Sequence, residues 1–116
     1  MPESLKDEAV VVTRTTMGWG PTELCEKLLR KYLEVQLQEK TVPRYVLLYS
    51  EGVKAACRGT DTAELLQKMV EQGCKVLLCS TCIDFFHLER SELVGTPSCM
   101  TDISQAMHSV QKLIWL

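Results

Sequence analysis

Two cysteines separated by two residues, Cys79-Ser80-Thr81-Cys82, stand where a predicted strand is followed by a predicted helix. The apolar run 75–78 is typical of a short buried strand, and residues 83–88 are typical of a helix. The loop between them is therefore expected at the carboxyl end of a strand, where open parallel sheets build their binding sites. A thiol at a helix N-terminus is exposed to the partial positive charge of unpaired amides, which favours the nucleophilic thiolate. Sulfur chemistry is the first hypothesis.

A single CxxC pair has four explanations. A thioredoxin-like dithiol uses one thiolate to attack and the other to resolve a mixed disulfide. A persulfide carrier accepts a sulfane sulfur and passes it on, a zinc site needs two further ligands, and a packing role needs no reactivity at all. The chain has no second CxxC, and His87 and His108 are isolated, so no metal is expected. The dithiol explanation is disfavoured because thioredoxins carry CxxC after the first strand of a different topology.

Two other predicted loops are expected at the same sheet edge. Residues 17–20 (Met17, Gly18, Trp19 and Gly20) follow the first strand, and their glycines could let backbone amides approach an anion or a thiol. A tight turn with Trp19 over the sheet edge explains them equally well. Residues 50–59, which include Gly52, Val53 and Lys54, follow the second strand. In a parallel sheet these loops and the CxxC segment project from one edge.

The remaining candidates have weaker support. Cys57 lies in the second loop and is a candidate partner thiol, whereas Cys25 and Cys74 are expected in the core and Cys99 is ambiguous. Asp84 closely follows the CxxC pair and could accept a proton, although a polar cap is favoured. The chain lacks a GxSxG elbow, a GxGxxG fingerprint and a P-loop, so none of these motifs supports acyl transfer or nucleotide binding.

The surrounding pattern predicts an α/β fold. Strands are expected at 9–13, 45–49, 74–78 and 112–116, with a short edge or irregular strand within 94–100 because of Pro97. A first helix is expected from Pro21, a second with Asp61 as N-cap and Glu64 completing a capping box, and a last one from Thr101. The first helix is expected to present one apolar face, made by Leu24, Leu28 and Tyr32 with Cys25, Leu29 and Leu33 beside them. The alternation predicts one three-layer α/β domain over 1–116 with a mainly parallel sheet, in which residues 1–8 form a flexible N-terminal segment.

The composition and charge of the chain argue against some classes of binding partner and favour none that is strongly anionic. The 116 residues carry a net charge of −2, and the pI is near 5.7, so neither nucleic acid nor an anionic membrane surface is an expected partner. No apolar run approaches the roughly 20 residues of a membrane span, and the polar N-terminus lacks a signal-peptide core. A cytoplasmic location with reduced cysteines is expected.

The order of these pieces resembles a known family. Thr16-Met17-Gly18-Trp19-Gly20, Gly52-Val53-Lys54 and Cys79-Ser80-Thr81-Cys82-Ile83-Asp84-Phe85 follow successive strands. Together they resemble the DsrE/DsrF-like family, and within it the C-terminal domain of YedF, a sulfurtransferase-like protein associated with selenium metabolism. The resemblance spans about residues 10–116. Ser80 stands where glycine is expected in the pattern, and Glu51 is an extra residue.

The resemblance implies a five-stranded parallel α/β/α fold, homo-oligomeric assembly and sulfur carried as a cysteine persulfide. Cys79 and Cys82 are the positions onto which the carrier role transfers, and Ser80, Thr81 and Asp84 belong to the same segment. No cofactor is implied. A TusA-like domain with a Cys-Pro-x-Pro motif does not precede Ala9, so a separate TusA-like sulfur carrier is the implied partner. Two alternatives stay open, namely a non-catalytic binding or assembly subunit and a CxxC dithiol redox module.

Overall fold

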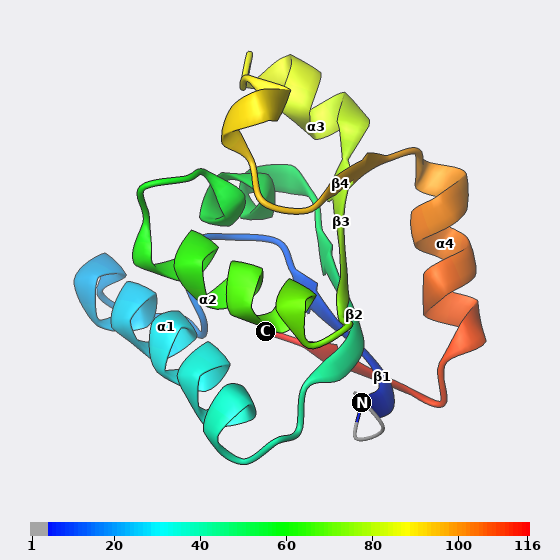
Figure 1. Cartoon of the computed structure of the whole chain (residues 1–116). Helices are drawn as coiled ribbons and strands as arrows, with labels where there is room; N and C mark the ends of the chain where they lie inside the picture. Colours follow the sequence, from blue (N-terminus) through cyan, green and yellow to red (C-terminus); the bar gives the residue numbers. More distant parts are fainter. Residues whose placement is uncertain (1–4) are drawn as a thin grey trace.

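Strands and helices alternate along the chain, and the computed structural model describes residues 5–116 (Figure 1). The strands are β1 (Lys6–Val12), β2 (Pro43–Leu48), β3 (Lys75–Cys79), β4 (Thr96–Ser98) and β5 (Lys112–Trp115). The α-helices are α1 (Thr22–Gln38), α2 (Asp61–Glu71), α3 (Ser80–Phe85) and α4 (Met100–Ser109). Two 3-10 helices complete the fold, η1 (Ser50–Ala56) and η2 (Arg90–Glu92).

The five strands form one parallel sheet in the order β4-β3-β2-β1-β5. The chain steps across the sheet in one direction from β1 to β4 and then crosses back to β5, on the far side of β1. Because such crossovers share one handedness, α1 and α2 lie on one side of the sheet and α4 on the other (Figure 1). The predicted three-layer α/β fold with a parallel sheet is confirmed.

The core forms around the three central strands. Val10 of β1, Val46 of β2 and Leu78 of β3 are each at most 1% exposed. Their lack of polar alternation is what a strand covered on both faces requires. The two edge strands of the sheet differ from these central strands in sequence and in exposure. At one edge β4 contains Pro97, as predicted, and at the other β5 leaves Leu113 and Trp115 39% and 58% exposed.

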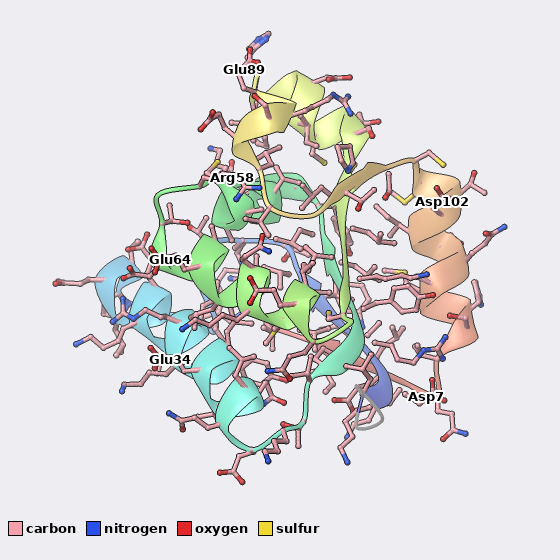
Figure 2. All side chains as sticks on the ribbon, viewed as in Figure 1. Asp7, Glu34, Arg58, Glu64, Glu89 and Asp102 are labelled. Atoms are coloured by element: carbon pink, nitrogen blue, oxygen red, sulfur yellow. The ribbon has the colours of Figure 1, made fainter. Side chains whose placement is uncertain are left out.

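Charged groups lie on the outer surfaces of the helices. Figure 2 shows Glu34 on α1 and Glu64 on α2 on one side of the sheet, and Asp102 on α4 on the other. Most ion pairs in the described part of the chain join exposed or half-exposed groups, as between Arg44 Nη1 and Asp7 Oδ1 at 2.7 Å. Such surface pairs contribute about 0–1 kcal/mol each, so the fold rests on its apolar core.

The first strand begins earlier than predicted. β1 starts at Lys6 instead of Ala9, because Lys6 pairs with Pro43 and its backbone N–H donates to the carbonyl oxygen of Val42 at 2.9 Å. The expectation of a flexible segment 1–8 is therefore wrong for residues 6–8, and residues 1–4 lie outside the described residues.

Helix α1 has two adjacent apolar stripes, and only one of them faces the core. Cys25, Leu29 and Leu33 are buried. Leu24 and Leu28, which were expected on the buried face, are 49% and 39% exposed. Spacing along a helix identifies such stripes but does not say which one the sheet covers.

Helix α2 is capped one residue earlier than predicted. Thr60 is the N-cap, and its Oγ1 accepts a hydrogen bond from the Ala63 backbone N–H at 3.1 Å. Asp61 is the first residue of the helix and not its cap. Both residue types cap well, so local sequence did not separate them.

Candidate functional site

The segments after β1, β2 and β3 meet at the carboxyl edge of the sheet, as the parallel topology requires. The Tyr49 backbone N–H donates to the Val12 carbonyl oxygen at 3.2 Å, which joins the ends of β2 and β1. The Ser50 backbone N–H lies 3.1 Å from Cys82 Sγ, which joins η1 to α3. The second predicted loop and the CxxC segment are thus in direct contact.

Cys79 is the last residue of β3 and not part of a loop. Helix α3 begins at the next residue, Ser80, so the expected loop between strand and helix is absent and Cys79 occupies the N-cap position. Its side chain is only 4% exposed. Cys79 therefore faces the interior and is poorly accessible to another molecule.

Cys82 lies one helical turn further on and is half-buried. Its Sγ accepts the Ser50 hydrogen bond, and its backbone carbonyl accepts the N–H of Phe86 at 3.0 Å. Ser50 has a φ of 55°, in the left-handed region that non-glycine residues rarely adopt. This backbone conformation is part of the geometry that places the Ser50 amide beside the sulfur.

Burial raises the pKa of the Cys82 thiol, and a hydrogen bond with the Cys79 thiol raises it further. The Ser50 amide acts in the opposite direction because it favours the thiolate. The net shift is upward, opposite to the effect predicted from a helix N-terminus. Helix α3 has only six residues, so burial decides the sign.

Gly52 lets η1 pack closely against the end of β1. A Cβ at this position would lie 2.1 Å from the Val12 carbonyl oxygen, closer than any real contact. Gly52 and the neighbouring Val53 are both buried. These two predicted ligand-loop residues therefore have a packing role, and they fix the position of Ser50.

Lys54 supplies a positive charge beside helix α3. Its Nζ lies 2.9 Å from Glu51 Oε1 and 4.3 Å from the ring centroid of Phe86. Phe86 lies one turn beyond Cys82 and is the C-cap of α3, so η1 contacts both the helix and its C-terminal end. The cation also favours the thiolate of Cys57, although burial raises the pKa of that thiol overall.

The other residues of the CxxC segment face outward. Asp84 Oδ1 accepts a hydrogen bond from Arg90 Nη2 at 3.0 Å, and the Asp84 side chain is 71% exposed. The favoured role of Asp84 as a helix cap is wrong, because it lies inside α3 and pairs with Arg90. Ser80 is half-buried and Thr81 is exposed on the first turn of the helix.

The glycine loop after β1 is less closely tied to the thiols. Met17 is half-buried, and its backbone N–H donates to the Cys25 carbonyl oxygen at 3.0 Å. Gly18 and Gly20 are exposed, and Trp19 is 91% exposed with the Arg14 guanidinium 4.3 Å from its ring centroid. The suggestion that Trp19 covers the sheet edge is therefore wrong, and its ring is open to solvent.

The four remaining cysteines differ clearly in their burial. Cys25 and Cys74 are buried as expected, and burial raises the pKa of Cys74 to about 12. Cys57 is half-buried and its backbone forms an isolated bridge with Leu93. Cys99 is exposed at the start of α4. Within residues 5–116, no group of three or more His, Cys, Asp or Glu side chains is arranged to hold a metal ion.

The sequence alone predicts no role for Ser50. It predicts a loop at the correct sheet edge for this residue, but serine carries no signal for a left-handed backbone. Its contact with Cys82 spans 32 residues of sequence, so only the assembled sheet reveals it.

The fold and the thiol pair define a small, open α/β protein with a candidate cysteine site at the carboxyl edge of a parallel sheet. The chain belongs to the DsrE/DsrF-like family, whose model matches residues 36–116. This region runs from the C-terminal part of α1 to the end of β5 and includes η1 and the CxxC segment. The predicted family resemblance is confirmed, and the closer likeness to YedF stays a prediction. The family is associated with sulfur relay in general.

Solved structures show the same fold. The ychN protein from E. coli has 21% identity and a TM-score of 0.71, covering 97% of this chain and 100% of that one. The protein BT1422 of unknown function from Bacteroides thetaiotaomicron has 15% identity and a TM-score of 0.64, covering 95% of each chain. The protein MTH1491 of unknown function from Methanobacterium thermoautotrophicum has 17% identity and a TM-score of 0.63, covering 94% of this chain and 96% of that one. Comparison with curated proteins gives no match. In the described part of the chain, no helix has the length and apolar character needed to cross a membrane.

Proposed function

We propose that this protein is a cytoplasmic sulfur carrier that holds sulfane sulfur as a persulfide on Cys82. The observation that carries the proposal is the 3.1 Å contact between the Ser50 backbone N–H and Cys82 Sγ. An amide aimed at a sulfur stabilises that sulfur as an anion. Cys82 is also the more accessible cysteine of the pair, because Cys79 is only 4% exposed.

In the loading step, the Cys82 thiolate attacks the outer sulfur of a donor persulfide. A bond forms between Cys82 Sγ and that sulfur, the donor's S–S bond breaks, and the donor leaves as a thiolate. In the unloading step, an acceptor thiolate attacks the outer sulfur and Cys82 leaves as a thiolate. The Ser50 amide assists both steps because it stabilises the anion that attacks first and leaves later. A TusA-like protein is the proposed partner.

Self-association is a further part of the proposal. The edge strand β5 presents Leu113 and Trp115 to solvent, and the Trp115 ring meets the Tyr49 ring edge-on with centroids 6.5 Å apart. Tyr49 immediately precedes Ser50, so this apolar edge continues to the candidate site. A second copy of the chain would remove both exposed side chains from water, which favours a homo-oligomer.

The carrier proposal is tested by exposing the protein to a low-molecular-weight persulfide and measuring intact mass. Measured immediately after exposure, wild type, Cys79→Ala and Cys99→Ser are each expected to gain about 32 Da for one sulfur atom, located on Cys82 by fragmentation. Cys82→Ser is expected to lose that adduct. Cys99→Ser is the matched control because Cys99 is exposed and lies outside the pair. Absence of sulfur on Cys82 in all variants would reject the proposal.

One observation favours a second candidate, a non-catalytic binding or assembly subunit. Burial and the Cys79 thiol raise the pKa of Cys82, which disfavours the reactive thiolate at neutral pH. A Cys82 that resists alkylation at neutral pH in the folded protein, and reacts only after unfolding, would support this candidate over the carrier.

A further inference from the structure

The two cysteines of the site lie at different depths below the protein surface, with Cys79 the more deeply buried. Cys79 is the N-cap of α3 and Cys82 is the third residue of the helix, so one turn separates them. Cα atoms three residues apart along a helix are about 5 Å apart, and bridged cysteines have Cα atoms about 4.4–6.8 Å apart. The positions of Cys79 and Cys82 along the chain therefore suit a disulfide between them. Of the two, only Cys82 has substantial exposure.

We propose that Cys79 discharges a Cys82 persulfide internally, forming a Cys79–Cys82 disulfide and releasing hydrogen sulfide. This inference rests on the proposed carrier function and adds to it a second, competing fate for the bound sulfur. It gives the buried cysteine a chemical role that the carrier function alone does not require.

The discharge step balances without an added oxidant. The Cys79 thiolate attacks Cys82 Sγ, a bond forms between the two Sγ atoms, and the bond from Cys82 Sγ to the outer sulfur breaks. The outer sulfur takes the electron pair and leaves as hydrosulfide, and the proton lost by Cys79 balances its charge. The sulfane sulfur is reduced and the two thiols are oxidised. An external dithiol returns the protein to its reduced form.

Because Cys79 is more deeply buried than Cys82, it is expected to attack the inner sulfur of the persulfide, which is Cys82 Sγ. Displacement at sulfur is in-line, so the attacking atom and the leaving atom lie on opposite sides of the central one. With Cys79 buried and Cys82 half-exposed, the added sulfur points to solvent and Cys79 approaches from the interior. A partner acceptor instead approaches from solvent and meets the outer sulfur first. The same persulfide is therefore transferred when an acceptor is docked and discharged when none is present.

The test follows the fate of loaded sulfur in single-turnover experiments. Wild type, Cys79→Ala and Cys79→Ser are loaded with a small persulfide, freed of donor by rapid desalting, and incubated without acceptor. Intact mass, released sulfide and free thiols are measured over time. Cys79→Ser preserves the volume of the buried side chain, so it covers the case in which Cys79→Ala perturbs folding. Cys99→Ser is the control for a cysteine outside the pair.

Wild type and Cys99→Ser are expected to lose the adduct and release one sulfide per adduct. Their product is about 2 Da lighter than the reduced protein because two thiol protons are lost. Both Cys79 variants are expected to retain the adduct at least about tenfold longer. A wild-type adduct as durable as that of the Cys79 variants overturns the inference and leaves the carrier function intact. If no variant takes up sulfur and wild type releases no sulfide, the carrier function fails and the inference falls with it.

Discussion

The backbone N–H of Ser50 lies 3.1 Å from the Sγ atom of Cys82, and Ser50 holds a left-handed backbone with a φ of 55°. The contact joins the segment after β2 to the helix after β3. It also identifies Cys82, and not the buried Cys79, as the sulfur that the surrounding backbone stabilises as an anion.

Replacing Ser50 with valine is expected to weaken this contact. A β-branched residue is strongly disfavoured at positive φ, so the backbone relaxes and the amide moves away from the sulfur. Because the amide lowers the pKa of Cys82, its loss should raise that pKa further and slow alkylation at neutral pH. The pH dependence of the alkylation rate measures the effect. Ser50→Gly keeps both the N–H and the backbone conformation, so it should behave as wild type. An unchanged profile in Ser50→Val would argue against a role for the amide.

Sulfur uptake is expected to rise with pH through the neutral range and to reach half its maximum above the ordinary thiol value of 9.0. The reason is that burial and the Cys79 thiol raise the pKa of Cys82, while the thiolate is the reactive form. Removing the Cys79 thiol takes away one of these causes. Cys79→Ala should therefore shift the midpoint to lower pH, as measured by stopped-flow alkylation of Cys82. A shift to higher pH would contradict the assigned sign.

Substitution of Gly52 by alanine should destabilise the protein and also disturb the packing of η1 at the candidate site. The added Cβ would meet the Val12 carbonyl oxygen at 2.1 Å, and backbone atoms must shift to make room. Overpacking of this kind costs about 1–3 kcal/mol of unfolding free energy, measurable by urea denaturation. Gly59→Ala is the comparison, because a Cβ there meets nothing within 4 Å and only its φ of 98° opposes the change. Equal losses of stability in the two variants, with unchanged Cys82 reactivity, would show that the packing of η1 is not critical.

Thr60, and not Asp61, should carry the capping energy of α2. Thr60→Ala removes the acceptor of the Ala63 N–H and is expected to cost about 1 kcal/mol of unfolding free energy. Asp61→Ala removes only an exposed pair with Arg30 at 3.5 Å, so its cost should stay below about 0.5 kcal/mol. Thermal or urea unfolding of both variants distinguishes them, and the reverse order would restore Asp61 as the cap.

Self-association through the β5 edge is expected to depend on its exposed apolar side chains. Leu113→Glu places a charge on this edge and should shift the protein toward the monomer in light scattering coupled to size-exclusion chromatography. Leu24→Glu is the matched control, because Leu24 is a comparably exposed leucine on α1. A monomeric wild type, or an equal effect of both substitutions, would contradict an interface on β5.

The sequence by itself determined the alternation of strands and helices, the parallel sheet and the edge at which the CxxC segment lies. Apolar runs such as 45–49 and 74–78 are local signals, and parallel connection places their carboxyl ends together. It also determined family membership, because the motifs after successive strands are specific in combination. The core positions of Cys25 and Cys74 followed from the same patterns.

Only the tertiary structure decided how the two cysteines differ. Cys79 is buried because β3 lies inside the sheet between β2 and β4, and Cys82 is reached by an amide 32 residues away. The upward pKa shift of Cys82 likewise depends on burial and on neighbours from other segments. Similarly, the sheet covers one apolar stripe of α1 and leaves Leu24 and Leu28 exposed. Local patterns set what each segment can form, whereas burial and long-range hydrogen bonds arise only when the segments are packed together.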